Sequence, residues 1–470
     1  MQWFLVLLLS MLLTLAAVGP PGIQWHWAGG RINVARQTSD GSYVLGGSDN
    51  DNYWVVRLST NGTFLWEARG VRPGDYFEDP VVDLQQTSDG GFIVLVETDP
   101  AIAGFGREDC QVIRLNPNGG IVWDRTFGAS DQDWPEKIMQ LPDGSFLFGA
   151  SFRQGSNGNR LSTNYGYIDW WFVHLDTNGN KVAEQSFGGS AIDFFTALTL
   201  TADGGFALVG ASSSPVSGNK TSPNYGRDDF WVVRLNANGD RIWDKSFGGD
   251  ANDQALSVWE TNGVLVVGGV SQSLATGNKT NATKGTWIIG LDANGNKLWE
   301  QALVDTNNYA PNSSLPRPAL LAAEDGGFFQ GDNFFFPTNY CCPSGYRVRR
   351  IGPQGEQTWE FKYFPDSFYL QPMQRTQDGG LIFGGGRDVF KLSPDALSAP
   401  PKIKFTSIGS NGFAFSLMGS SNTDYAIERS FDFVVWQFIS TNRLIGNQMQ
   451  ITDPTSSNLN QASYRARVVR

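Results

Sequence analysis

The stretch DFWVVRLNANGDRIWDKSFGGD, residues 229–250, decides the fold of this chain. It contains two apolar runs joined by Asn238-Gly239, and the second run leads into Phe-Gly-Gly. Both runs are rich in Val, Ile, Phe and Trp and are bounded by turn residues, which predicts two β-strands. Glycine after asparagine supplies the positive φ that a tight turn needs. The stretch is therefore predicted to be a β-hairpin.

The same hairpin recurs along the chain, each time after another apolar pair of runs joined by Asp-Gly or Asn-Gly. This first turn starts at Asp40, Asp89, Asp143, Asp203, Asn262, Asp325 and Asp378. The third runs are Trp54–Leu58, Gln111–Leu115, Trp171–Leu175, Trp231–Leu235, Trp287–Leu291, Arg347–Ile351 and Asp388–Leu392. The fourth runs carry Trp66, Trp123, Trp243, Trp299 and Trp359, with Ala183 in one unit. Each unit is predicted to be a four-stranded antiparallel meander, the shape of a propeller blade.

The two ends of the repeat region complement one another. The last unit stops at Leu392 without its Trp-bearing strand, and the segment Gln24–Gly30 near the N-terminus resembles that missing strand. A ring closed in this way leaves no unpaired inner edge. We predict an all-β fold: a seven-bladed β-propeller of four-stranded antiparallel blades, closed by the N-terminal strand, and a small C-terminal β-sandwich.

Composition shifts divide the chain into four segments. Residues 1–19 are predicted to be a signal peptide, because the apolar run Phe4–Val18 ends in small residues and is short for a membrane span. Residues 20–393 form the predicted propeller, 394–401 a Pro/Ser/Ala linker, and 402–470 the small β-sandwich. We expect a secreted or cell-surface protein whose mature chain has no membrane span.

Charge and rare residues exclude several functions. The net charge of −11 argues against a nucleic-acid partner, which needs clustered Lys and Arg. The chain has only His26 and His174, so a Ser-His-Asp triad or a multi-histidine metal site is not expected. Three cysteines form no disulfide framework, but Cys341 and Cys342 are adjacent. A vicinal disulfide is our hypothesis for this pair, with free thiols or an intermolecular bond as alternatives.

Ligand binding is expected on one face of the ring. The short turns share one face, whereas the second-to-third loops and the blade-to-blade loops are long and share the other, where function concentrates. Three of the long loops echo one another, as in Ser217-Gly218-Asn219-Lys220. The candidate ligand-binding residues are Asn164, Tyr165, Asn224, Tyr225, Asp133, Asp193 and Asp253. They suit a sugar or cation site, but regular repetition favours the alternative that they fold the loops.

Acidic residues also recur after Phe-Gly-Gly, at Asp131, Asp133, Asp193, Asp250 and Asp253. Acid–base catalysis, Ca²⁺ binding and a turn role are the alternatives, and the repetition favours the turn. We assign no catalytic residue and predict no cofactor, with Ca²⁺ left open. The Asp-X-Asn-Gly-Asn segments at Asp176 and Asp292 lack the Glu and helices of an EF-hand, so we interpret them as hairpin turns. Third-strand Arg57, Arg114, His174 and Arg234 are expected to pair across the strands with Glu67, Asp124, Glu184 and Asp244.

Two resemblances follow from these motifs. The segments Asp229–Asp250 and Ser217–Gly226 resemble the Gly-Gly-rich propeller repeats of large secreted bacterial proteins that carry sorting domains. The C-terminal segment resembles a fibronectin-III-like module of exported proteins from bacteria related to Verrucomicrobia. The matching residues there are Tyr425-Ala426-Ile427-Glu428, Asp432–Trp436, Asp453-Pro454 and Tyr464–Arg467. The resemblance of the repeats implies export and a propeller but no reaction. For the module we favour a spacer or surface-display role over carbohydrate binding, because such modules are commonly surface spacers in multidomain chains.

These observations favour a binding or scaffold propeller displayed outside the cell, with a glycan or protein ligand on the long-loop face. The alternative is an extracellular propeller enzyme, either glycan-active or quinoprotein-like. Leu291–Trp299 resembles a segment of quinoprotein dehydrogenases, which typically have eight blades. Ser59–Trp66 resembles the Asp-box of sialidase-like propellers, but Asn61 stands in place of its Asp, and no arginine triad accompanies it.

Overall fold

The computed structural model describes most of the predicted blades and part of the C-terminal module. The described residues are 23–50, 52–70, 79–98, 105–155, 158–304, 319–323, 327–334, 345–352, 357–363, 373–392, 402–409, 412–418, 423–430, 437–444, 448–453 and 463–468. Throughout these ranges the regular structure is β-strand. No helix among them is long and apolar enough to cross a membrane. The predicted signal peptide, Cys341 and Cys342 lie outside the described residues.

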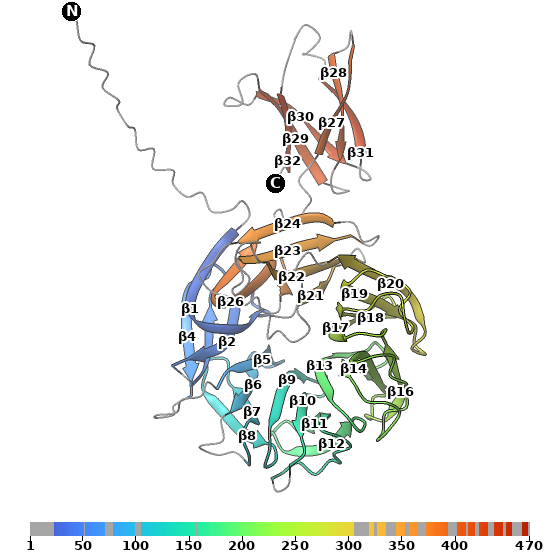
Figure 1. The fold of residues 1–470 in the computed structure, drawn as a ribbon. Coiled ribbons are helices and arrows are strands. Elements are labelled where there is room, and N and C mark those ends of the chain that lie inside the picture. Colours follow the sequence, from blue (N-terminus) through green and yellow to red (C-terminus); the bar gives the residue numbers. More distant parts are fainter. Residues whose placement is uncertain are drawn as a thin grey trace, which may run out of the picture.

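Five complete blades follow one another around a ring, each a four-stranded antiparallel sheet (Figure 1). Blade 2 contains β5 (Val81–Gln86), β6 (Phe92–Thr98), β7 (Asp109–Leu115) and β8 (Ile121–Phe127). Blade 3 contains β9 (Asp133–Gln140), β10 (Phe146–Arg153), β11 (Ile168–Leu175) and β12 (Lys181–Phe187). Blade 4 contains β13 (Asp193–Leu200), β14 (Phe206–Ser212), β15 (Asp229–Leu235) and β16 (Arg241–Phe247). Blade 5 contains β17 (Asp253–Thr261), β18 (Val264–Ser271), β19 (Gly285–Leu291) and β20 (Lys297–Val304). Blade 6 contains β21 (Ala319–Ala322), β22 (Phe328–Phe334), β23 (Gly345–Ile351) and β24 (Gln357–Tyr363).

Blades 1 and 7 share the long N-terminal strand, and this sharing closes the ring. The first part of β1 (Ile23–Gln37) pairs with β26 (Leu381–Leu392), for example His26 with Phe390. Its second part pairs with β2 (Tyr43–Asp49), which is followed by β3 (Asn52–Leu58) and β4 (Phe64–Arg69). The short β25 (Gln374–Arg375) pairs with the start of β26. The predicted closure by the N-terminal strand is therefore confirmed, and so is the count of seven blades.

In blade 7 the second and third strands are so closely joined that they form the single element β26. A Cβ atom on Gly380 would lie 2.2 Å from the carbonyl oxygen of Leu392, and one on Gly384 would lie 2.4 Å from that of Asp388. The two halves of β26 therefore lie side by side as a hairpin. The long loop that separates these strands in other blades is reduced here to a tight turn.

The glycine-containing turns match the sequence prediction, with one refinement. In the turn after β3, the Ser59 N–H donates to the Thr63 carbonyl at 2.7 Å, and Gly62 alone has positive φ, at 81°. This is a type I turn followed by a left-handed glycine. Blade 5 differs, because both Asn262 and Gly263 have positive φ and Thr261 pairs directly with Val264. Asparagine in place of aspartate thus accompanies a two-residue type I′ hairpin.

Three fourth-strand tryptophans, Trp66, Trp123 and Trp243, fasten their blades to the next one. The indole N–H of Trp66 donates to the carbonyl of Pro117 in the turn after β7, and its ring packs edge-on against Phe92 with centroids 5.6 Å apart. Trp123 and Trp243 make the same bond to the turns of blades 3 and 5, reaching the carbonyls of Thr177 and Ala293 at 3.2 and 3.0 Å. The recurring Trp is therefore an interblade contact as well as a strand former.

Blade 3 carries Ala183 at this position, and a cavity of about 60 Å³ lies there. Leu147, Phe206 and Ala237 line the cavity, and Ala237 occupies the turn position whose carbonyl accepts the indole N–H in other blades. Gln185 partly replaces the missing interblade hydrogen bond, because its amide donates to the Gly239 carbonyl in the turn of blade 4 at 3.0 Å. The junction between blades 3 and 4 thus has room for the missing indole.

The expected cross-strand ion pairs of the third strands are wrong. Arg57 lies opposite Trp66, while Glu67 lies opposite Val56 and so points to the other face of the blade. The arginines instead reach the aspartate of the first turn in their own blade: Arg57 with Asp40, Arg114 with Asp89 and Arg234 with Asp203. The His174 ring bonds the Ser145 hydroxyl. The fourth-strand acids accept side-chain N–H groups: Glu67 from Trp54, Asp124 from Gln111, Glu184 from Trp171 and Asp244 from Trp231.

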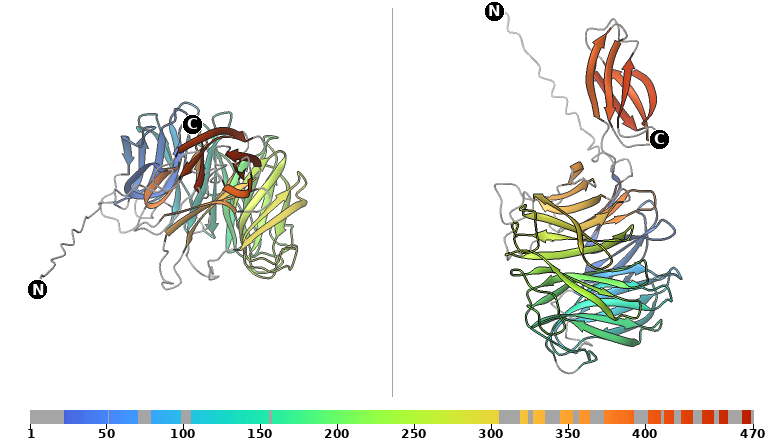
Figure 2. Two further views of the ribbon diagram at one scale, coloured as in Figure 1. Left: turned by 90° about the horizontal axis from the view of Figure 1, so that it is seen from above. Right: turned by 90° about the vertical axis from the view of Figure 1, so that its right-hand side faces the viewer.

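The C-terminal module is a β-sandwich of two three-stranded sheets. One sheet contains β27 (Lys402–Gly409), β28 (Gly412–Met418) and β31 (Gln448–Asp453). The other contains β30 (Gln437–Leu444), β29 (Thr423–Ser430) and β32 (Ser463–Val468). Leu417, Tyr425, Ile427 and Ile451 form its described core, and Figure 2 shows the module in two further views. The predicted sandwich is confirmed; its relation to fibronectin-III-like modules stays a prediction.

We predict that Ala183→Trp stabilises the protein. An indole at this position fills the cavity and donates to the turn of blade 4, as Trp66 and Trp123 do at their junctions, so a gain of about 1 kcal/mol is expected. Thermal or chemical unfolding measures the effect. The matched control is Val182→Trp, which places an indole on the exposed side of the same strand, where no gain is expected. Equal gains in both variants, or a loss in Ala183→Trp, would contradict this account of the junction.

Candidate functional site

The long loops of blades 3, 4 and 5 hold the preceding blade through an asparagine side chain. In blade 4, Asn219 accepts the Gly188 N–H at 2.9 Å and donates to the Ser186 carbonyl at 2.8 Å, both at the end of β12. Asn159 makes the same two bonds with Gly128 and Thr126, and Asn278 makes them with Gly248 and Ser246. We call this arrangement the Asn clamp. It extends the backbone pairing of one blade into the loop of the next.

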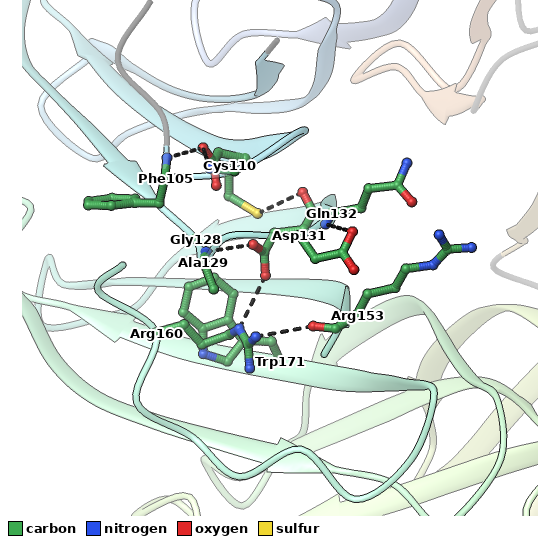
Figure 3. A network of polar contacts seen from close by, with 12 residues as sticks. Phe105, Cys110, Gly128, Ala129, Asp131, Gln132, Arg153, Arg160 and Trp171 are labelled. Carbon is green, nitrogen blue, oxygen red and sulfur yellow. Dashed lines mark hydrogen bonds and ion pairs between the residues drawn. The ribbon is translucent and has the colours of Figure 1, made fainter. Parts of the chain in front are cut away.

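A basic side chain follows each clamp residue and is buried beside it. The ammonium group of Lys220 donates to the carbonyls of Ser222 and Pro223 and lies 5.9 Å from the centre of the Trp231 ring. Lys279 occupies the same place in blade 5. In blade 3 the residue is Arg160, whose guanidinium lies over the Phe152 ring and 3.3 Å from an Asp133 oxygen (Figure 3). The repeated loop is therefore an ordered, hydrogen-bonded structure.

Two buried aspartates meet at each of these junctions. Asp133, Asp193 and Asp253 begin the first strands and accept the backbone N–H of Ala129, Gly189 and Gly249 at 2.7–2.8 Å. Asp109, Asp169 and Asp229 begin the third strands of the preceding blades and accept the N–H of Phe105, Tyr165 and Tyr225. Every one of these six side chains is buried. The carboxylates thus organise the loop on one side and the blade linker on the other.

A single glycine separates the two carboxylates of a junction. A Cβ atom on Gly248 would lie 2.0 Å from an Asp229 oxygen and 2.8 Å from an Asp253 oxygen. Gly128 stands in the same relation to Asp109 and Asp133. This close approach explains the first glycine of Phe-Gly-Gly, because any side chain there would displace a buried carboxylate.

Burial raises the pKa of Asp133, Asp169 and Asp229 to about 7, and the negative charge of the second aspartate at each junction adds to the shift. The same cause raises the pKa of Asp193 and Asp253, which also accept hydroxyl hydrogen bonds from Ser214 and Ser273. Protonation of one carboxyl group in a pair would relieve this repulsion. Since the pairs are closed to solvent, they have no access to a substrate.

The predicted site residues are divided between this buried layer and the surface. Asp133, Asp193 and Asp253 belong to the carboxylate pairs and are sealed. Asn224 holds its own loop through the carbonyls of Ser213 and Arg227, and Asn164 is partly buried in the equivalent loop. Tyr165 and Tyr225 pack against Gly218 and Gly277 of the next blade. Tyr225 keeps 37% of its surface exposed. Whether they bind a ligand stays a prediction.

The remaining acidic residues have local partners. Asp131 accepts the Gln132 N–H, and Asp250 accepts the Thr276 hydroxyl at 3.0 Å. Asp176 and Asp292 accept backbone N–H groups of their own turns, so their interpretation as hairpin turns is confirmed. Among the residues that the structure describes, no three His, Cys, Asp or Glu side chains are grouped to hold a metal ion.

The described cysteine is structural. Cys110 is fully buried, and its sulfur contacts the carbonyl of Asp133 at 3.7 Å (Figure 3). Burial, reinforced by the nearby Asp133 and Asp109 carboxylates, raises the pKa of this thiol well above its usual value. A thiol in this state is a poor nucleophile. The Cys341–Cys342 disulfide stays a prediction for residues outside the described ranges.

Apolar side chains stand exposed at the tips of the same loops. They are Phe105, Leu161, Tyr167, Val216, Tyr225 and Leu274, spread over blades 2 to 5. Leu161 exposes 82% of its surface. The Arg153 guanidinium lies between the rings of Trp134 and Tyr167, at 5.4 and 5.0 Å from their centres. The face above the buried layer therefore combines aliphatic, aromatic and cationic groups.

By its architecture the chain is a β-propeller with an appended β-sandwich. No protein-family model matches it, and no curated protein sequence does either. It is similar to hydrazine synthase from Kuenenia stuttgartiensis, at 12% identity over 76% of this chain and 93% of that one, with a TM-score of 0.48. It is also similar to the WD40 domain of Toxoplasma gondii coronin, at 9% identity over 81% and 92%, with a TM-score of 0.43. A protein of unknown function from Bacteroides caccae matches at 11% identity over 68% and 93%, with a TM-score of 0.37. At such low identity these similarities carry no argument about activity.

We predict that the folded state is more stable at pH 5 than at pH 8. The pKa of Asp133, Asp169 and Asp229 lies near 7 in the folded protein and near 4 in an unfolded chain, so folding retains protons between these values. Stability is then fully present below pH 4 for these groups and is lost as the pH rises through 7. Each of these carboxyl groups lowers the free energy of unfolding by about 1.4 kcal/mol for every pH unit between pH 4 and pH 7.

Chemical unfolding at several pH values tests this. Asp169→Asn, whose amide is neutral at every pH, is expected to flatten the slope between pH 5 and 8, whereas Asp250→Asn, at an exposed position, leaves it unchanged. A stability that rises from pH 5 to 8 would refute the assignment. The turn aspartates affect the pH dependence of stability only at lower pH. For example, despite some burial, hydrogen bonds from Thr38 and Ser42 lower the pKa of Asp40 to about 2.

Proposed function

We propose that the chain is a binding propeller that works outside the cell and contacts a glycan through the long-loop face of blades 2 to 5. The observation that carries this proposal is the set of exposed apolar side chains at the loop tips. Exposed apolar side chains that lie on one face of a protein are a feature of interaction sites. A protein ligand is the alternative on the same face.

The layer below supports a fixed binding surface. The Asn clamps, the buried basic residues and the carboxylate pairs hold the loop bases of blades 3, 4 and 5 in place. A surface that is already ordered loses little conformational entropy on binding. The exposed Tyr225 ring and the Arg153 guanidinium over the Tyr167 ring offer the ring faces and hydrogen-bond donors that sugars use.

Binding is favoured over catalysis by the state of the ionisable groups. The carboxyls of Asp133, Asp169 and Asp229 have the raised pKa that a general acid needs, but all three are sealed from solvent. His174 bonds Ser145 near a short turn, on the side away from the long loops. The proposed export by residues 1–19 and the spacer role of the module agree with display of the long-loop face.

The proposal predicts glycan binding that depends on the loop tips. The triple variant Leu161→Glu, Val216→Glu and Leu274→Glu places charge on the contact surface, and at least a tenfold loss of affinity is expected. A glycan array, followed by calorimetry on the glycans that bind, measures it. Val122→Glu, on the exposed outer strand of blade 2, is the matched control and should bind as the unmodified protein does.

Unchanged binding by the triple variant would move the site away from the long-loop face. Absence of glycan binding together with hydrolysis of a polysaccharide would favour the enzyme alternative. Absence of both would favour a protein ligand.

A further inference from the structure

Blade 5 departs from the other blades at two positions that normally act together. The third-strand arginine that bonds the first-turn aspartate is Gly290 here, and the aspartate is Asn262. Blades 1, 2 and 4 keep the Arg–Asp pair, and blade 7 replaces it with Lys391–Asp378. Blade 5 has thus lost both partners of an ion pair that faces the next blade.

The absence of an arginine side chain at Gly290 lets a tryptophan ring lie against the backbone of β19. Trp299 lies directly opposite Gly290, and a Cβ atom on Gly290 would lie only 2.2–2.6 Å from the Trp299 ring. The indole therefore occupies the space that an arginine side chain takes in other blades. The Trp299 side chain remains 42% exposed. Trp66, Trp123 and Trp243 differ from it, because their indole N–H groups donate to a carbonyl in the turn of the following blade.

A cleft of about 630 Å³ lies beside this indole, between blades 5 and 6. Val266, Ile288 and Leu303 of blade 5 and Phe328 of blade 6 line it, and Trp259 and Trp299 add two indole faces. This volume lies within the range of small-molecule sites, which are mostly apolar with a few polar groups. The cleft is about ten times the volume of the one at Ala183.

The polar side chains of the cleft are amides, the Thr261 hydroxyl, the indole N–H groups of Trp259 and Trp299, and a carboxylate that is already engaged. Glu300 accepts the N–H groups of Thr280 and Asn281 at 2.8 and 2.5 Å and pairs with Lys297. The side chains of Asn262 and Gln301 form no hydrogen bond with the described part of the chain. Among the described lining residues there is no Lys, Arg or His. An anionic ligand therefore finds no partner, while a neutral hydroxyl or carbonyl finds two amides.

We infer that this cleft is a binding site for an uncharged small molecule with a flat apolar ring system and a polar substituent. The rings stack against Trp299 and displace water from the partly exposed Trp259, Val264 and Leu303, which supplies the hydrophobic part of the affinity. The substituent bonds Gln301 or Asn262 at the rim. This site goes beyond the proposed function, because it lies beside the short turn of blade 5 and uses no loop-tip residue.

The test uses 2-naphthol as the probe and 2-naphthalenesulfonate as its anionic counterpart. Quenching of tryptophan fluorescence and calorimetry on the full chain measure binding. Binding of 2-naphthol at least tenfold tighter than that of the sulfonate is expected. Failure of 2-naphthol to bind up to its solubility, or equal binding of the two probes, overturns the inference.

Gly290→Arg tests the position of the site. The arginine restores the residue of the other blades, where it bonds carbonyls such as those of Phe206 and Leu235, and it pushes the indole back toward blade 6. At least a tenfold weaker binding of 2-naphthol is expected. The matched control is Leu298→Ala, next to Trp299 but on the exposed outer side, which should bind normally. Equal effects of the two variants would contradict the site.

Gln301→Ala gives a second variant that leaves the core intact. It should weaken 2-naphthol several-fold and leave unsubstituted naphthalene unchanged, because only the hydroxyl loses a partner. Equal loss for both probes would contradict the assigned rim. The loop-tip triple variant should bind 2-naphthol normally, so failure of the cleft and failure of the long-loop face are separable.

Discussion

Fastening neighbouring blades is the constraint on which the rest of this structure depends. Blades 2 to 6 are separate sheets, so their junctions rest on side-chain contacts and on loop hydrogen bonds such as that from the Asn219 N–H to the Gly188 carbonyl. The Asn clamp joins neighbouring blades at three junctions, since Asn159, Asn219 and Asn278 each bond both a backbone N–H and a carbonyl of the preceding blade. On the opposite face the fourth-strand tryptophans bond the following turn. Both contacts are present at the junction of blades 2 and 3 and at that of blades 4 and 5, which are therefore held at both faces.

Most of the chemistry in the repeat follows from this fastening. The paired aspartates anchor the loop and the linker that the clamp brings together, and their burial gives them raised pKa values without access to a substrate. The positions at which a blade lacks the usual fastening residues are therefore more informative about ligand binding. Ala183 leaves a small cavity, and Gly290 with Asn262 leaves a large one. Function in this fold is expected where the fastening is relaxed or where its loops project into solvent.

The blades and their closure could be predicted from the sequence, because hairpin turns and strand composition are local signals. The Trp25-bearing segment matched the missing strand for the same reason. The partner of Arg57 could not be predicted, since a left-handed glycine in the turn after β3 shifts the register and places Glu67 on the other face. Asn219 was visible as a repeated residue, but its two bonds join different blades and depend on the closed ring. Asp169 and Asp229 precede the apolar runs, a signal that recurs and could have marked the pairs.

Hydrogen exchange followed by mass spectrometry tests the fastening role of the long loops most directly. The account predicts that the N–H groups of Gly128, Gly188 and Gly248 are protected in the unmodified protein. In Asn219→Ala, protection should fall at Gly188, at the junction of blades 3 and 4, while Gly128 and Gly248 keep theirs. Unchanged exchange at Gly188, or an equal loss at all three glycines, would contradict the claim that each loop secures its own junction.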